Sequence, residues 1–224
     1  MGTDNLFHKR KLRSNKSLQR RKAKKASYDR ILIVCEGKKT EPNYFKELRQ
    51  HFRLSSVNIE IENNTSGSAP ISVVDHALKK YKETKDYDRV YCVFDKDTHP
   101  SYAQALDKIR RSRLGNGHKI MAAQSAPCFE FWILLHFEYT AGSFSATGKA
   151  SICASVINRI KEKHYIPDYE KGAKDLASIL IPRLDFAIKN AKNVELFHKE
   201  SCTESDNPST KVHELVEYLR SLKN

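Results

Sequence analysis

The chain has 224 residues and a formal net charge of +13 at pH 7, from 40 Lys and Arg against 27 Asp and Glu. That length is enough to bury a hydrophobic core and fits one domain, or one domain with a helical appendage. No apolar run approaches the roughly 18 residues needed to cross a bilayer, and the start lacks the apolar core of a signal peptide, so we expect a soluble, cytoplasmic protein with no membrane association.

Residues 1–27 form the first segment, and most of the excess charge lies there. Ten Lys and Arg side chains between residues 1 and 25 face a single acid, Asp4. Because the segment has no apolar period, we expect a disordered arm that is attracted to polyphosphate by counterion release. The candidate nucleic-acid-binding residues of the arm are Lys9, Arg10, Lys11, Arg13, Arg20, Arg21 and Lys22. The alternative is a solvated tail that only confers solubility.

The stretch "RILIVCEGKKTEPNYF" predicts the first strand, over 31–35, with Glu36 at its exit. A continuous apolar run is typical of a parallel strand covered by helices on both faces. Ligands of open α/β sheets bind outside the carboxyl ends of the strands, so Glu36 is a candidate site residue; the alternative is a polar turn into the next helix. Lys38 and Lys39 follow directly and are candidates to hold a phosphate, or ordinary solvated lysines.

Strands and helices then alternate along the chain. "TEPNYFKELRQHF", "SAPISVVDHALKKYKE" and "SYAQALDKIRRSRL" are periodic as helices, and "VNIEIEN", "DRVYCVFDKD" and "HKIMAAQS" predict three further strands. This order implies a mostly parallel α/β sheet with helices on both faces over 28–140. The pattern after Glu130 is mainly helical, so 141–224 is predicted to be a helical part packed on that core.

The third strand ends in "VYCVFDKDTH", which places Asp95 and Asp97 two residues apart. Alternate residues of an extended segment point the same way, so both carboxylates can project from the sheet edge. Two like charges so close repel unless a cation lies between them, and Mg²⁺ prefers oxygen ligands. With Glu36 at the same edge, the sequence predicts a metal site formed by Glu36, Asp95 and Asp97. A turn or capping pair is the alternative.

Glu130, in "PCFEFWILLHFE", is predicted at the start of a buried helix near the same edge. It is either a carboxylate that favours the helix N-terminus or part of the site. His136, six residues later, is expected to be a core histidine on the opposite side of the helix.

The five cysteines contain no C-x-x-C pair, and Cys35 and Cys92 lie inside apolar strands. We expect all of them to be small buried hydrophobic residues in a reducing compartment, with no zinc site.

Glu36-Gly37 after the first strand and Asp95-Lys96-Asp97 after a later one resemble the Toprim domain of topoisomerases, primases and several nucleases. More specifically, "ILIVCEGKKTEPNYF", "SAPCFEFWILLHFE", "YEKG" and "NPSTKVHELVEYL", in that order, resemble the RloB-like family of bacterial defence proteins. This resemblance covers roughly residues 30–222.

The resemblance implies a Toprim-like nuclease that needs Mg²⁺, with Mn²⁺ as a substitute. Glu36 matches the glutamate that moves a proton, and Asp95 and Asp97 match the metal-binding pair. A third acid of the Toprim pattern would fall at His99, and Glu130 could supply the missing carboxylate. The resemblance further implies antiphage defence by abortive infection, RNA with transfer RNA as one target class, and an ABC-type ATPase encoded nearby as partner. The oligomeric state, including a homo-oligomer, stays open.

Two other functions compete with the nuclease. "VYCVFDKDTH" also fits the D-x-D-T signature of haloacid-dehalogenase-type phosphatases, with Asp95 as nucleophile and Ser125 placed to bind phosphate, but a later acidic motif for Mg²⁺ is missing. The other is a non-catalytic RNA-binding adaptor of an ATPase. Lys171 in "YEKG" and Lys211 in "NPSTKV" lie in the matched motifs, but the residues alone indicate no role for them.

Overall fold

The structure is a computed structural model that describes residues 28–67, 69–96, 99–146, 148, 150–201 and 206–222. The predicted basic arm and Asp97 therefore lie outside the described residues. The strands are β1 (Ile31–Cys35), β2 (Ile59–Asn63), β3 (Arg89–Val93), β4 (Lys119–Ala122), β5 (Ser125–Ala126) and β6 (Ser209–Thr210). The helices are α2 (Thr40–His51), α3 (Pro70–Thr84), α4 (Tyr102–Arg111), α5 (Glu130–Leu134), α6 (Ile152–Glu162), α7 (Leu176–Leu180), α8 (Leu184–Glu200) and α9 (Val212–Ser221), with 3₁₀ turns η1 (Gly115–Gly117) and η2 (Ile181–Arg183).

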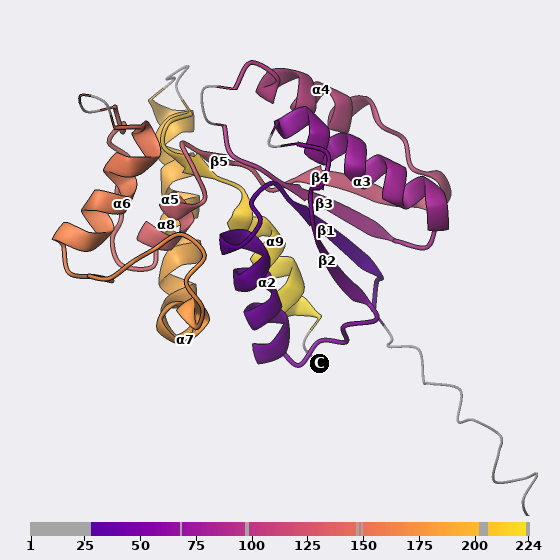
Figure 1. Ribbon diagram of the computed structural model, residues 1–224, viewed down its shortest axis with the longest axis horizontal. Helices are drawn as coiled ribbons and strands as arrows, with labels where there is room; N and C mark the ends of the chain where they lie inside the picture. The colour runs from indigo at the N-terminus through magenta and orange to yellow at the C-terminus, as the bar shows by residue number, and fades with distance from the viewer. Residues whose placement is uncertain are drawn as a thin grey trace, which may run out of the picture.

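Four parallel strands form the central sheet in the order β2-β1-β3-β4, which confirms the predicted α/β class (Figure 1). The chain passes from β1 outward to β2 and then crosses back over β1 to β3. The strand order therefore reverses between β1 and β3. In open α/β sheets this switch point is where ligands bind, outside the carboxyl ends of the strands.

Helices cover both faces of the sheet, as the alternation of strands and helices predicts. One hydrophobic cluster joins the α3 and α4 face to side chains such as Leu32 and Val34. The other cluster holds Ile31 and Ile33 together with α2, α5 and α9. Successive residues of β1 thus point to opposite faces, and both are buried, which is why this strand is apolar throughout.

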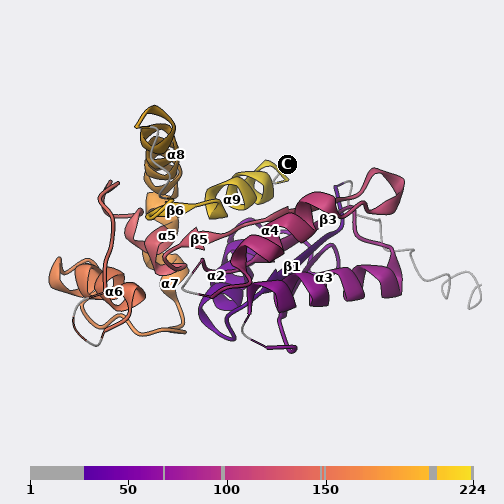
Figure 2. The ribbon, with the colours of Figure 1, turned by 90° about the horizontal axis from the view of Figure 1, so that it is seen from above.

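Helices α5 to α8 lie beyond the carboxyl ends of the strands, on the side away from α3 (Figures 1 and 2). They share one hydrophobic cluster with the sheet. The two-residue strands β5 and β6 pair in antiparallel fashion and bring the end of the chain back to the sheet.

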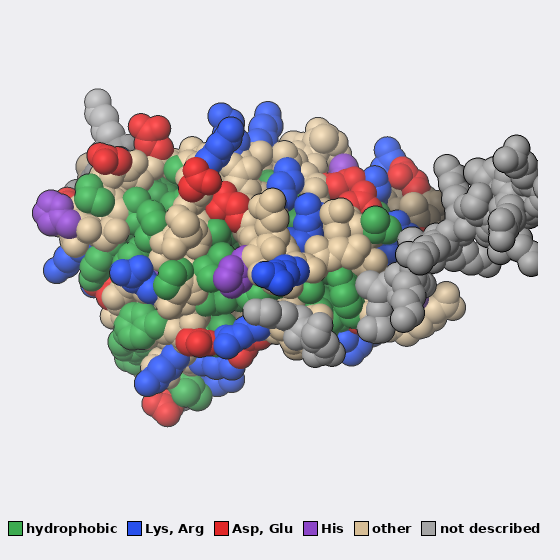
Figure 3. All heavy atoms as spheres, turned by 90° about the horizontal axis from the view of Figure 1, so that it is seen from below, with side chains coloured by type: hydrophobic (Ala, Val, Ile, Leu, Met, Phe, Trp, Pro, Cys, Tyr) green, Lys and Arg blue, Asp and Glu red, His purple; other side chains and the backbone are tan. Residues whose placement is uncertain are grey.

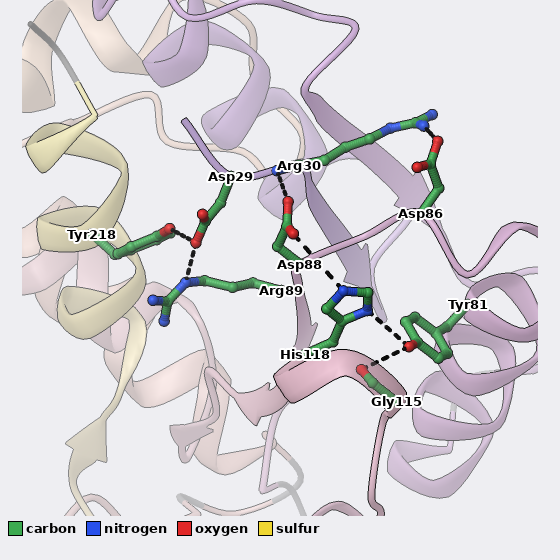
Figure 4. A network of polar contacts seen from close by, with 9 residues as sticks. All are labelled: Asp29, Arg30, Tyr81, Asp86, Asp88, Arg89, Gly115, His118 and Tyr218. Atoms are coloured by element: carbon green, nitrogen blue, oxygen red, sulfur yellow. Dashed lines mark hydrogen bonds and ion pairs between the residues drawn. The ribbon is translucent and has the colours of Figure 1, made fainter. Parts of the chain in front are cut away.

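Helix α9 is fastened to the opposite, amino-terminal edge of the sheet (Figure 4). The Tyr218 hydroxyl donates to Asp29 at 2.5 Å, and Arg89 Nε donates to the same carboxylate at 2.8 Å. These two hydrogen bonds hold the pKa of Asp29 below its usual range. The Arg89 guanidinium also lies over the Tyr218 ring at 4.1 Å.

Acidic and basic side chains are interspersed with apolar ones on the face seen in Figure 3. This mixture agrees with the composition, because residues 26–224 contain 30 Lys and Arg against 26 Asp and Glu. Within the described part of the chain, no helix has the length and apolar character required to traverse a bilayer.

Candidate active site

Glu36 and Asp95 follow β1 and β3 directly, one on each side of the switch point. The Glu36 amide continues the ladder by donating to the Val93 carbonyl at 2.9 Å. Its side chain then turns across to the neighbouring strand, where Glu36 Oε2 accepts a hydrogen bond from the Asp95 amide at 3.0 Å. The parallel pairing of β1 with β3 thus brings together two acids that are 59 residues apart in sequence.

A pocket of about 410 Å³ opens at this point. Four carboxylates, Glu36, Glu41, Asp95 and Glu130, line it together with Lys38, Lys39 and Lys171. Burial, and then the charges of Glu41, Glu130 and Glu36, raise the pKa of Asp95 well above its usual range. A cation bound next to Asp95 would offset this repulsion and favour the charged form of its carboxyl.

Glu41 was not predicted as a site residue. It lies in the first turn of α2 and is 7% exposed, and burial raises the pKa of its carboxyl above the usual range. A Cβ on Gly37 would lie 2.0 Å from Glu41 Oε2, so the glycine is required for the carboxylate to fold back over the strand exit. The signal in the sequence was an acid in the first turn of the helix that follows Glu36, which is common for stability alone.

Glu130 lies both at the start of a helix and at the pocket. It is the first residue of α5, with 2% of its surface exposed, and it also lines the pocket. The Tyr169 hydroxyl donates to Glu130 Oε1 at 3.2 Å, and Lys171 Nζ lies 3.5 Å from the same oxygen. Tyr169 and Lys171 come from the loop between α6 and α7, so the helical part completes one wall of the pocket.

The cysteine prediction is correct for two residues and wrong for two others. Cys35 and Cys92 are free and buried in the sheet. Cys128 and Cys153 form a disulfide with a Cα–Cα distance of 5.8 Å, and Cys153 Sγ lies 3.2 Å from Glu130 Oε2. The packing of α5 against α6 brings the two residues together although 25 positions separate them, and no local spacing in the sequence reports such packing.

Two of the remaining candidate residues line the pocket, and two do not. Lys38 and Lys39 are exposed at the pocket, as their positions after Glu36 predict. His136 is fully buried and its Nδ1 contacts the Trp132 carbonyl at 2.9 Å; burial lowers its pKa to about 4. It is a core histidine, as expected. Lys211 lies elsewhere, 2.8 Å from Glu195 and 2.7 Å from Glu214.

The donor atoms of the pocket suit a hard cation. Carboxylate oxygens are the ligands that Mg²⁺ takes, and Mg²⁺ is usually held by one or two carboxylates while it keeps several waters. Glu36 and Asp95 both offer a carboxylate to the pocket. Among the described residues, two groups of three ligand atoms lie within 4.8 Å of one another: Glu130 of the pocket with the disulfide-bonded Cys128 and Cys153, and Glu195 with His213 and Glu214. The described pocket is therefore suited to a partly hydrated ion rather than to a closed cage.

The fold and this pocket define an α/β protein with a carboxylate-rich site at the switch point of a parallel sheet. A family model described as RloB-like protein matches residues 31–219. The chain belongs to the RloB-like family, which confirms the resemblance of its four ordered motifs to that family. Neither the comparison with curated proteins nor the one with solved structures returned a match.

Proposed function

We propose that the chain is a Toprim-like, Mg²⁺-dependent nuclease that cleaves a nucleic-acid phosphodiester, with RNA favoured over DNA. The observation that carries the proposal is the pocket at the switch point, where four carboxylates meet three lysines. Carboxylates alone would repel a phosphate, and lysines alone would only bind one. Together, the carboxylates can hold a metal ion and accept a proton, while the lysines can bind the phosphate of the substrate.

Each residue has a chemical task in this proposal. Asp95, together with Asp97, would hold the ion, and Glu36 would accept the proton of the attacking oxygen. A bound Mg²⁺ supplies charge stabilisation at the phosphoryl oxygens. Lys38 and Lys39 lie at the exposed rim, where they can contact the flanking phosphates. The biological setting we propose is antiphage defence by abortive infection, under the control of an ABC-type ATPase encoded nearby.

The phosphatase alternative has less support. That reading needs Ser125 to meet a phosphate, but Ser125 is 1% exposed and its hydroxyl is hydrogen-bonded to Thr210 Oγ1 at 2.9 Å. The phosphatase reading also leaves Glu36 without a task.

A cleavage assay tests the proposal. Purified protein, alone and with its ATPase partner, is incubated with transfer RNA, single-stranded RNA, single-stranded DNA and duplex DNA in Mg²⁺, in Mn²⁺ or in a chelator. We expect cleavage that needs the metal and is lost in Asp95→Asn. Release of phosphate from p-nitrophenyl phosphate without cleavage of any polymer would favour the phosphatase. Binding of RNA without either reaction would favour the adaptor.

A further inference from the structure

The loop that carries Tyr169, Lys171 and Gly172 is seated on α2, the helix that also carries Glu41. The Gly172 amide donates to Thr40 Oγ1 at 2.8 Å. Further along, Glu47 of the same helix accepts hydrogen bonds from the amides of Asp175 at 3.1 Å and Ala177 at 2.8 Å. The stretch that directly follows Lys171 is thus fixed to α2 through three of its amides.

Gly172 lets this loop approach the pocket closely. Its φ is +82°, a conformation that strongly favours glycine, and a Cβ there would lie 2.7 Å from Lys39 Cβ. The backbone of the loop therefore lies directly against the stem of Lys39. Lys171 therefore lies on the side of the pocket that the helical part forms.

Tyr169 and Glu130 hold the ammonium group of Lys171 at the pocket. Tyr169 is buried and its hydroxyl donates to Glu130 Oε1, the oxygen from which Lys171 Nζ is 3.5 Å away. The Lys171 side chain is 57% exposed. The ammonium group therefore stays accessible from the pocket while it lies close to the Glu130 carboxylate.

We propose that Lys171 binds a non-bridging oxygen of the scissile phosphate and stabilises the charge that develops there, with Tyr169 and Glu130 as positioning residues. This inference rests on the proposed nuclease function. In the step, the bond from phosphorus to the attacking oxygen forms while the bond to the leaving oxygen breaks, and the leaving oxygen keeps that electron pair and takes a proton from water. The proton of the attacking oxygen passes to Glu36, and Lys171 keeps its own proton throughout. Tyr169 and Glu130 hold the Lys171 ammonium group in place before the reaction, near the phosphate oxygen on which negative charge develops. Such preorganisation is the condition for a large electrostatic contribution to catalysis.

The test compares Lys171→Met and Lys171→Arg with a matched control, Lys174→Met, an exposed lysine of the same loop that does not line the pocket. Single-turnover cleavage of a labelled RNA is measured at saturating protein and fixed Mg²⁺, and Mn²⁺ binding is measured by calorimetry. We expect Lys171→Met to cleave about 10²- to 10³-fold more slowly at saturation. Lys171→Arg should recover part of the rate, and Lys174→Met should match the wild type. Mn²⁺ affinity in Lys171→Met should be unchanged or higher, because a competing cation has been removed.

The outcomes separate the two proposals. If the wild type cleaves and Lys171→Met cleaves equally fast, the assignment of Lys171 is wrong while the nuclease stands. A slow variant that has also lost Mn²⁺ binding would mean that Lys171 organises the metal site and does not act on the phosphate, which overturns the inference as well. A wild type that cleaves no polymer under any condition removes the nuclease, and this inference with it.

Discussion

Glu36 Oε2 accepts a hydrogen bond from the backbone amide of Asp95 at 3.0 Å, which locks the end of β1 to the end of β3. The bond uses one carboxylate oxygen of Glu36 and the backbone of Asp95, so the Asp95 carboxylate takes no part in it. It fixes the proposed proton acceptor relative to the proposed metal ligand. A rigid link of this kind is what a site on strand ends can supply and a site on loops alone cannot.

The first prediction concerns metal removal and pH. The pKa of the Asp95 carboxyl is raised in the folded protein. Ionisation of Asp95 therefore lowers the free energy of unfolding as the pH rises above about 4, which is the pKa of an aspartate in an unfolded chain. In the presence of a chelator we therefore expect Asp95→Asn to have a higher melting temperature than the wild type at pH 7. The increase should be roughly 2–4 °C for each kcal/mol of repulsion removed. The difference should shrink as the pH is lowered toward 4.

Added Mg²⁺ should reverse that order. An ion that binds only the folded wild type stabilises it by about 2.7 kcal/mol at a concentration 100 times its Kd. Asp95→Asn should gain little. Thermal melts with and without Mg²⁺ check this, and equal metal-induced shifts in both proteins would show that Asp95 is not a ligand.

The basic arm provides a second prediction, made from the sequence alone. Deleting residues 1–25 should weaken nucleic-acid binding and flatten its dependence on salt, because up to about ten phosphate contacts would be lost. Binding of labelled RNA is measured between low and physiological salt for both proteins. An unaltered salt slope would assign the arm to solubility or to a protein partner.

Tyr218 provides a third prediction, on stability. Removing its hydroxyl with Tyr218→Phe should lower the free energy of unfolding at pH 7 by about 1–2 kcal/mol, since the hydrogen bond to the charged Asp29 is lost. The pKa of Asp29 is lowered in the folded state, so this contribution is present above about pH 4 and is lost as the pH falls below that value. Urea titrations at pH 7 and pH 3 measure it.

Tyr139→Phe is the matched control, because Tyr139 is 46% exposed. A loss in Tyr218→Phe that is equal at both pH values would mean that the charge on Asp29 does not contribute. Cleavage should be unaffected, since this contact lies at the edge of the sheet opposite the pocket.

The disulfide provides a fourth prediction. Closing a loop between Cys128 and Cys153 should stabilise the protein by about 3 kcal/mol through the unfolded state. Cys153→Ser should therefore melt lower than the wild type without a reductant, and the difference should shrink when dithiothreitol is present. Mass spectrometry of a non-reduced digest should find the Cys128 and Cys153 peptides linked. Two unlinked peptides and identical melts would contradict the bond.

Much of the sheet could be predicted because its strands carry a strong local signal. The apolar run of Ile31 to Cys35 is explained by burial on both faces, and the acids that follow β1 and β3 mark the edge of the sheet. The short strands β5 and β6 were missed. Two residues cannot show a period, and their pairing depends on a contact between Ser125 and Thr210, which are 85 positions apart.

The position of a site residue was predictable only where the strand that precedes it determines that position. Glu36 and Asp95 directly follow strands of one parallel sheet, so the alternation of strands and helices was enough to place both at the same edge. Glu41 depends on the space left by Gly37, and Lys171 depends on how the loop after α6 sits on α2. Thr40 illustrates the difference: it is the first residue of α2, and its hydroxyl accepts a hydrogen bond from the distant Gly172 amide.

The most direct test of the proposed nuclease is single-turnover cleavage of RNA by Glu36→Gln at matched Mg²⁺, with Glu170→Gln as the control. The amide can still accept the hydrogen bond from Asp95, so the pocket keeps its shape, while the group that takes the proton is gone. We predict cleavage about 10²- to 10⁴-fold slower, with RNA binding retained and the control at the wild-type rate. A wild-type rate in Glu36→Gln would contradict the assignment of Glu36 as proton acceptor and with it the proposed mechanism.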